Sequence, residues 1–123
     1  MKEKINYILN SLEGVHSAMK MLHWSTTNKS EHLLTDEIDG SVLEYEDKIA
    51  EAAMGVLGDR FGIGDLKTLL PEHKDVKGIL GELQKDVLDL ENKLSDAKYN
   101  GIVNILDDLL TDINKWNYLR TLK

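Results

Sequence analysis

The chain has 123 residues, enough for one domain with a modest core but not for two. Its formal charge of −7 argues against a general affinity for nucleic acid and favours cations. The absence of cysteine excludes disulfides and thiolate metal sites, and no apolar run reaches the roughly 18 residues that a membrane span needs. We therefore expect a cytoplasmic domain that neither enters a membrane nor binds nucleic acid.

The first half of the chain has the periodicity of two long helices. Apolar residues at steps of three and four predict a helix from about Lys2 to Trp24. Polar residues 25–29 end this helix, and Ser30 is expected to cap a second helix that runs to about Leu57. The apolar stripe of the second helix comprises Leu34, Ile38, Val42, Tyr45, Ile49, Ala53 and Val56.

A loop and a third helix are predicted next. Glycines are frequent between residues 55 and 64, which indicates a loop through about Leu70 with room for one short helical turn. The third helix is expected to begin at Pro71 or Glu72, since proline is tolerated in a first turn. Its apolar residues alternate at steps of four and three as far as Leu94.

The fourth helix follows a predicted tight turn at Tyr99-Asn100-Gly101, in which Gly101 takes the left-handed conformation that stops a helix. The apolar stripe of the fourth helix comprises Ile102, Ile105, Leu106, Leu109, Ile113, Trp116 and Leu119. Four amphipathic helices, joined by a short, a long and a short connection, predict an all-α fold. We expect an antiparallel four-helix bundle that occupies residues 1–123 as a single domain.

The second helix carries two pairs of polar residues at four-residue spacing, His32 with Asp36 and Asp47 with Glu51. At about 100° per residue, all four lie on one side of the helix, nearly opposite its apolar stripe. The two pairs are separated by about 22 Å along the helix axis, so they cannot share an ion within one chain.

Symmetry offers a way to join the two pairs, because their residue numbers are symmetric about a point close to Gly40–Ser41. Two copies of this helix that cross antiparallel there would bring the first pair of one chain to the second pair of the other, and a two-fold dimer makes this contact twice. A glycine at the crossing lets the two backbones approach closely. Three apolar residues share this face and would be buried between subunits: Leu43, Ala50 and Met54.

His23, near the end of the first helix, is a further candidate ligand. Imidazole and carboxylate groups together suit iron, with manganese or zinc as alternatives. His23, His32 and Asp36 of one chain, with Asp47 and Glu51 of the partner, would leave coordination positions open for oxygen or peroxide. The simpler alternatives are a solvated acidic helix face and, for His23, a histidine favoured by the helix dipole.

The motifs resemble a known family at this point. The pair His23-Trp24, the step His32-x3-Asp36 and the segment Asp47-Lys48-Ile49-Ala50-Glu51 resemble the ferroxidase signature of the Dps branch of the ferritins. The segment Asp112-Ile113-Asn114-Lys115-Trp116 is similar to the last helix of that family. The interval between His23 and His32 is shorter than is usual there, and a lysine-rich tail of the kind that binds DNA is absent.

The resemblance implies oxidation of ferrous iron by peroxide or oxygen, and storage of the ferric product in a shell of two-fold dimers. It implies that the same residues bind the metal and carry out catalysis: His23, His32, Asp36, Asp47 and Glu51. A hypothesis of a different class stays open, in which the chain is a non-enzymatic, ferritin-like helical oligomer that acts as a binding or structural module. His16 and His73 are expected to be packing or surface residues, and Trp24 a core or interface aromatic.

Overall fold

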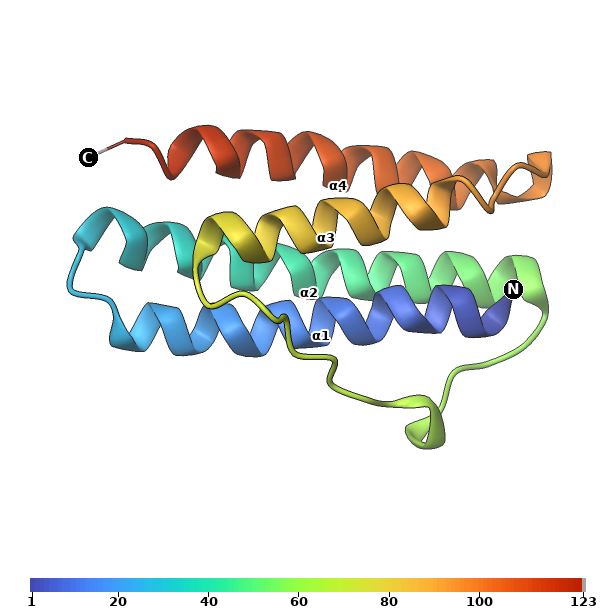
Figure 1. Cartoon of the computed structure of the whole chain (residues 1–123). Helices are drawn as coiled ribbons and strands as arrows, with labels where there is room; N and C mark the ends of the chain where they lie inside the picture. The colour runs from blue at the N-terminus through green and yellow to red at the C-terminus, as the bar shows by residue number, and fades with distance from the viewer. Residues whose placement is uncertain (123) are drawn as a thin grey trace.

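The computed structural model describes residues 1–122, and over that range it is helical without strands (Figure 1). This confirms the predicted all-α class with four main helices. The elements are α1 (Lys2–Ser25), α2 (Lys29–Leu57), the short 3-10 helix η1 (Ile63–Asp65), α3 (Val76–Glu91), the short 3-10 helix η2 (Ala97–Tyr99) and α4 (Asn100–Leu119).

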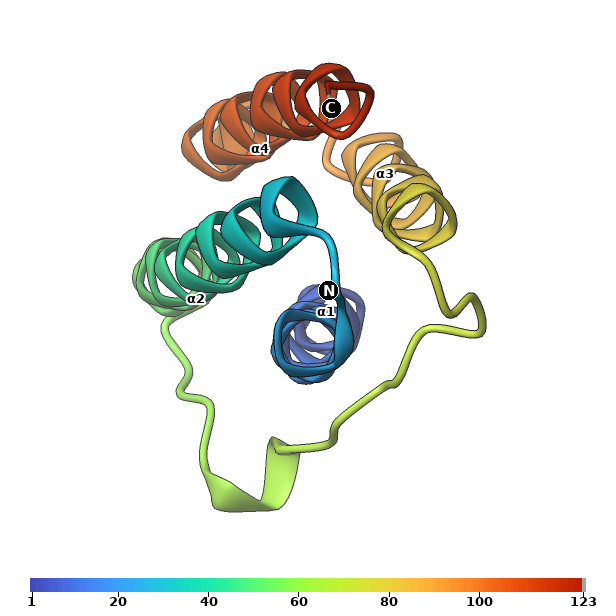
Figure 2. The same cartoon turned by 90° about the vertical axis from the view of Figure 1, so that its left-hand side faces the viewer.

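The four α-helices surround one core. α1 contacts α2 and α3, and α4 contacts the same two helices. The segment that joins α2 to α3, residues 58–75, is here called the crossover; it passes along the outer side of α1 (Figure 2). The largest side chains that the core buries completely include Trp116, Ile5, Ile8, Leu12, Met19, Ile38 and Ile49. The predicted stripe of α2 is buried except for Val56, which is 37% exposed.

The turn between α1 and α2 spans only three residues. Asn28, and not the predicted Ser30, caps α2, because its side chain accepts a hydrogen bond from the Glu31 amide at 2.9 Å. The Thr26 hydroxyl donates to the Glu31 carboxylate at 3.2 Å and accepts from the Asn28 amide. These bonds make a tight, well-defined reversal, and the predicted end of α2 at Leu57 is confirmed by Gly58 in the left-handed conformation.

The predicted start of α3 at Pro71 or Glu72 is wrong. The helix begins at Val76, and Asp75 caps it by accepting from the Gly78 amide at 2.8 Å. The preceding residues are held outside the helix by the Glu82 carboxylate, which accepts from the Glu72 and His73 amides at 3.0 and 2.8 Å.

The connection between α3 and α4 also differs from the prediction. α3 ends at Glu91 rather than continuing to Leu94, and η2 leads directly into α4. Gly101 lies inside α4 and does not adopt a positive φ; within residues 1–122 only Gly58 does so. Leu94 is nonetheless buried, so its apolar character reflects contact with the core rather than continuation of α3.

The crossover is fastened to α1 by the buried Asn10 and by Gly14. Asn10 donates through Nδ2 to the Asp65 carbonyl at 3.1 Å, and its Oδ1 accepts from the Lys67 amide at 2.9 Å. Its own carbonyl accepts from the Leu69 amide at 3.2 Å. A Cβ atom added at Gly14 would lie 1.7 Å from the Leu69 carbonyl oxygen, so this close approach requires glycine.

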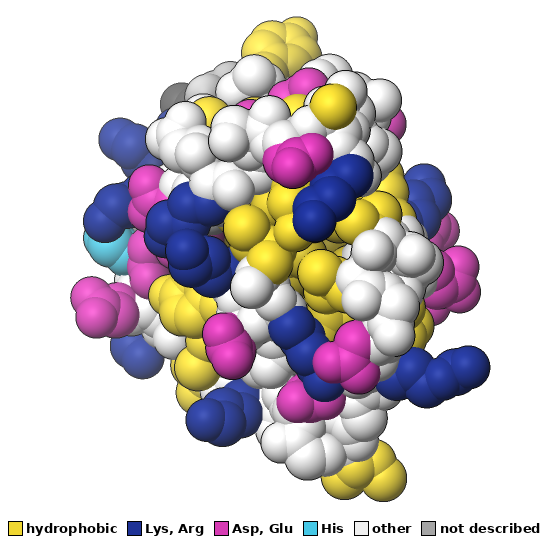
Figure 3. All heavy atoms as spheres, turned by 90° about the vertical axis from the view of Figure 1, so that its right-hand side faces the viewer, with side chains coloured by type: hydrophobic (Ala, Val, Ile, Leu, Met, Phe, Trp, Pro, Cys, Tyr) yellow, Lys and Arg dark blue, Asp and Glu magenta, His cyan; other side chains and the backbone are white. Residues whose placement is uncertain are grey.

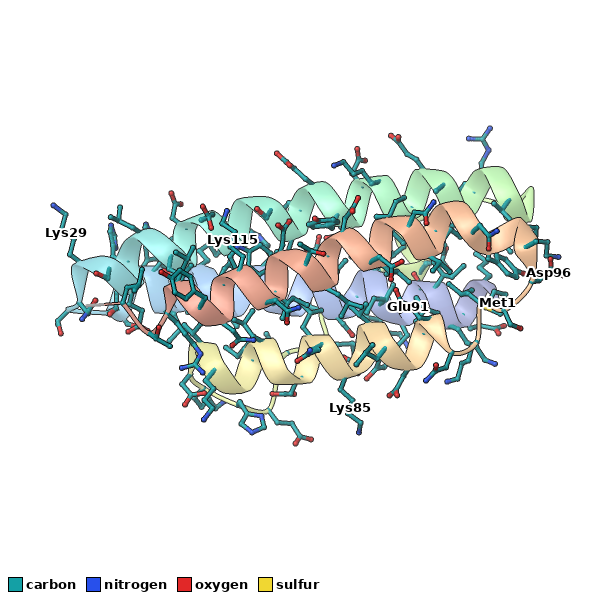
Figure 4. All side chains as sticks on the ribbon, turned by 90° about the horizontal axis from the view of Figure 1, so that it is seen from above. Met1, Lys29, Lys85, Glu91, Asp96 and Lys115 are labelled. Atoms are coloured by element: carbon teal, nitrogen blue, oxygen red, sulfur yellow. The ribbon has the colours of Figure 1, made fainter. Side chains whose placement is uncertain are left out.

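Two polar contacts tie α2 to α4. The Tyr45 hydroxyl donates to the Asp112 carboxylate, and Trp116 Nε1 donates to Glu37 at 3.1 Å. Burial and the bond to Asp112 raise the pKa of Tyr45 well above its ordinary value. Lys115 adds an ion pair with Glu37 at 3.8 Å (Figure 4). Residues 112–116 of α4 therefore hold α2 in place through these contacts.

One end of the bundle carries both charged and apolar side chains. At the end of the bundle where α1 begins, hydrophobic side chains gather near the centre and charged side chains surround them (Figure 3). Within residues 1–122, no helix combines the length and the hydrophobicity needed to cross a membrane.

We predict that Gly14→Ala lowers the free energy of unfolding by about 1–3 kcal/mol, because the new methyl group must displace the crossover backbone. Gly81→Ala is the matched control: it lies inside α3 with no heavy atom within 4 Å of an added Cβ, and it should stabilise by about 0.5–1 kcal/mol. Chemical denaturation of both variants measures the difference. Equal effects would contradict the close contact between Gly14 and Leu69.

Candidate metal centre

The short α1–α2 turn brings His23 and His32 into direct contact. Their rings stack with centroids 3.8 Å apart and an interplanar angle of 15°. Nδ1 of His23 lies 2.7 Å from the His32 carbonyl oxygen, and Nδ1 of His32 lies 2.8 Å from the His23 carbonyl oxygen. A carbonyl only accepts, so each Nδ1 carries a proton and donates it. In the neutral rings, both Nε2 lone pairs are then free to bind a metal, the arrangement typical of histidine ligands.

Asp36 lies one helical turn beyond His32 on α2. Asp36 and His32 are exposed, whereas His23 is half-buried against the turn. The end of the α1–α2 hairpin therefore presents two stacked imidazoles, one from each helix, and the Asp36 carboxylate lies one turn farther along α2.

The other predicted pair, Asp47 and Glu51, is also exposed and lies farther along α2. Within residues 1–122, no three histidine, aspartate or glutamate side chains form a group that could hold a metal ion. The chain by itself thus carries the predicted ligands in two separate sets, as their spacing along the helix requires.

Asp47 borders an acidic cavity of about 320 Å³ between α1, α2 and the crossover. Leu43 and Ala50, which the sequence assigned to a subunit interface, line this cavity too, opposite Phe61 and Leu66 of the crossover. Their apolar character therefore has a role inside the chain. The carboxylates of the cavity are those of Glu13, Glu46, Asp47 and Asp65.

Glu46 is the most perturbed group of this cavity. Burial, a hydrogen bond with the Glu13 carboxyl group and the negative charges of Glu13 and Asp47 raise the pKa of Glu46 to about 8. One oxygen of Glu46 is buried without a hydrogen-bond partner. A carboxyl–carboxylate pair of this kind shares one proton at neutral pH, because two adjacent negative charges cannot both be accommodated.

A similar pair joins α3 to α4, where Glu91 meets Asp107. Burial is the largest cause that raises the pKa of Glu91 to about 7, and the hydrogen bond with Asp107 and the negative charge of Asp107 act in the same direction. Glu91 lies among the helices, in contrast to Lys85 of the same helix, which points away from the bundle (Figure 4). Each helical hairpin thus contains one carboxyl–carboxylate contact.

Sequence reasoning missed the polar residues along the α1–α2 seam. His16, predicted as a packing or surface residue, forms a hydrogen bond with Asp39 across the seam. A short turn places residues equally distant from it opposite one another, so the turn alone would have paired His16 with Asp39 and His23 with His32. Trp24, predicted as a core or interface aromatic, is 66% exposed in the single chain. His73 is exposed, as predicted.

In a comparison with protein families, the model of DUF5856, a family of unknown function, matches residues 23–119 of the chain. The chain belongs to the DUF5856 family. The DUF5856 match begins at His23 and spans α2, the crossover, α3 and α4, so it includes every predicted ligand. Neither curated proteins nor solved structures gave a match to the chain.

We predict that Glu46→Gln removes part of the pH dependence of stability. The folded-state pKa of about 8 lies above the ordinary value of 4.5, so the contribution of Glu46 is complete below about pH 4.5 and is lost as the pH rises to about 8. Glutamine stays neutral. Relative to the wild type, the free energy of unfolding of the variant should therefore rise as the pH increases from about 4.5 to about 8. The difference should reach about 1–2 kcal/mol in favour of the variant, after allowance for solvent screening.

Chemical denaturation between pH 4.5 and pH 9, a range chosen around the pKa of about 8, measures this effect. Glu44→Gln is the matched control, since Glu44 is exposed on the same helix. Parallel stability profiles for Glu46→Gln and the wild type would show that Glu46 ionises normally in the folded chain.

Proposed function

We propose that this protein is a small Dps-like ferritin that binds ferrous iron and oxidises it at a site shared between two subunits. The observation that carries the proposal is the reciprocal pairing of His23 and His32, which protonates both Nδ1 atoms and leaves both Nε2 atoms free. Backbone carbonyls commonly orient histidine ligands in this way. Iron is the substrate, and peroxide or oxygen is the oxidant.

The chain path supports a ferritin-like, antiparallel topology as part of the proposal. In Figure 1, α2 returns alongside α1, the crossover then leads back to the end where α2 began, and α4 returns alongside α3. The helix pairs α1–α2, α1–α3, α2–α4 and α3–α4 then each run in opposite directions. A bundle with one long crossover connection is the arrangement of ferritin-like folds.

Each residue has a role in the proposed site. His23, His32 and Asp36 of one subunit bind ferrous iron, and Asp47 and Glu51 of the partner complete or bridge the site. Carboxylate oxygens are hard ligands and favour the higher charge of the ferric product. The same ligand set accepts manganese or zinc, so metal analysis of the purified protein belongs to the test.

The acidic cavity beside Asp47 supports cation attraction to this face of α2. It gathers four carboxyl groups, of which Glu13 and Glu46 share one proton and Asp65 is paired with Lys2 at 3.8 Å. The charge of Asp47 and the single charge of the Glu13–Glu46 pair remain to attract a cation. The formal charge of −7 adds a favourable long-range field for cations.

Gly40 supports the proposed two-fold crossing. It is exposed in the middle of α2, and a Cβ atom there would meet no heavy atom within 4 Å. Glycine inside a helix costs roughly 0.5–1 kcal/mol relative to alanine, and packing within this chain does not require it. In the proposed dimer, the absence of a side chain at Gly40 allows the backbone of the partner's α2 to approach closely.

We predict that the double variant Asp47→Ala/Glu51→Ala abolishes ferrous oxidation, because each site loses both ligands from one subunit. Asp89→Ala/Asp108→Ala is the matched control, since it removes two exposed carboxylates from α3 and α4. Stopped-flow absorbance after addition of ferrous iron and peroxide reports the rate. A wild-type rate in the first variant would refute the assignment of these residues. A rate for the wild type no higher than that of a protein-free solution would favour the non-enzymatic alternative.

A mixing experiment tests whether the site is shared. His32→Ala and Asp47→Ala/Glu51→Ala are each expected to be inactive alone. In a mixed dimer, one site combines both defects and the other combines only intact ligands. Random pairing of equal amounts should therefore restore about a quarter of the wild-type sites. No recovery on co-refolding, with mixed dimers shown by mass spectrometry, would rule out a shared site.

We also predict that Gly40→Leu weakens dimerisation and both metal sites together, although Gly40 is not a proposed ligand. Overpacking a tight helix crossing costs roughly 1–3 kcal/mol or more. The open space around Gly40 within the chain means that the helical fold itself should persist. Light scattering combined with a ferrous titration measures both effects, with circular dichroism as the control for folding. An unchanged dimer mass would place the interface elsewhere.

A further inference from the structure

A second concave surface lies between α1, the crossover and the first turn of α3, and it shares no residue with the proposed metal site. It has a volume of about 410 Å³, within the range of roughly 300–1,000 Å³ that is usual for ligand sites. Its apolar lining consists of Ala18, Met21, Leu22, Leu70, Pro71 and Ile79. We call this surface the Lys20–Lys74 groove after the two lysines that also line it.

The far wall of the groove is held in place at both ends. On one side of Leu70, the Leu69 amide donates to the Asn10 carbonyl at 3.2 Å. On the other side, Nδ1 of His73 donates to Glu82 at 2.7 Å. An added Cβ at Gly78 would lie 2.4 Å from the His73 ring, so the ring rests directly on α3. The groove is therefore largely formed before any ligand binds.

The charge of the groove is opposite to that of the chain. The chain contains 22 acidic and 15 basic residues, yet no aspartate or glutamate lines the groove. Its polar lining consists of Ser17, Lys20, Ser25, His73 and Lys74. Two lysines without a lining carboxylate, beside an apolar floor, complement a ligand with an anionic head and an apolar tail. The Lys20 ammonium lies 5.5 Å from the centroid of the exposed Trp24 ring, next to the groove.

Two of the apolar side chains of the groove are open to solvent, whereas Ile79 is buried. Met21 is 57% exposed and Leu70 is 66% exposed. Both belong to the same concave lining rather than to separate surface positions. Covering them with an alkyl chain would remove apolar area from water, which is favourable by roughly 25 cal/mol per Å².

We propose that the Lys20–Lys74 groove binds a small amphipathic anion, namely a medium-chain monocarboxylate whose head contacts the two lysines. The tail lies on the apolar floor between α1 and Leu70. The size of the groove suits such a ligand, and its charge selects the anion against a neutral or cationic molecule of equal length.

The test is a titration of the ¹⁵N-labelled full chain with sodium decanoate, followed by amide chemical shifts. The expected result is saturable shifts at groove residues such as Ala18, Met21 and Leu70. Lys20→Gln/Lys74→Gln should weaken binding by about tenfold, because it removes both charge-assisted contacts. Lys29→Gln/Lys77→Gln is the matched control, since both lysines are exposed and lie outside the groove lining; it should bind as the wild type does.

Decyltrimethylammonium bromide provides the opposite head group on the same tail. It should bind at least about tenfold more weakly than decanoate if the lysines select the anion. The proposal is overturned if decanoate gives no saturable shifts, if the shifts lie away from the groove, or if the Lys20 and Lys74 variant binds like its control. Because the groove and the metal site share no residue, ferrous oxidation tests the proposed function separately.

Discussion

The reciprocal hydrogen bonds between His23 and His32 fix the relation between the first two helices. Each imidazole donates to the backbone of the opposite helix, so the bonds hold the helix ends together in both directions. The three-residue turn leaves little freedom for any other register. From that register follows the contact of His16 with Asp39, which lie on opposite sides of the turn at about the same distance from it. One local reversal thus determines both the histidine pair and this second polar contact between α1 and α2.

The crossover depends on a second set of polar bonds. Asn10 is 5% exposed and would be costly to bury alone, but its side chain and carbonyl together make three hydrogen bonds with the crossover. These bonds, together with Gly14, hold the chain close to α1 on its way to α3. The same segment closes the acidic cavity near one end of α1 and forms the wall of the Lys20–Lys74 groove near the other. An irregular segment therefore shapes both concave surfaces.

Periodicity predicted the helices well where one face is buried along their full length. α1 and α2 lie within a residue or two of their predicted bounds for this reason. Proline at position 71 was a poor guide to α3, because Glu82 holds the next two amides and Asp75 provides the cap. Gly101 was predicted to end a helix in a tight turn, but it is the second residue of α4, whose apolar face is buried along the whole helix.

The sequence predicted the carboxylates of the candidate site on α2 but not the contact between its two histidines. The four-residue spacing on α2 identified Asp36, Asp47 and Glu51 as exposed residues on a common face, because that spacing is a property of any helix. The stacking of His23 on His32 was not predictable from either helix alone, since it depends on the turn between them. The short interval between His23 and His32 brings the two rings together.

The proposed dimer also has an electrostatic requirement. Each shared site would gather Asp36 of one subunit and Asp47 and Glu51 of the other, and like charges brought together oppose association. A divalent cation at that point offsets two of the three negative charges and supplies the bonds that hold the two halves. Binding to the dimer but not to the separate chains then shifts the equilibrium toward the dimer by mass action. In the proposed arrangement, iron both reacts at the interface and stabilises it. The net charge of −7 on each chain makes dimerisation depend more strongly on the bound cation, because two chains of like charge repel one another.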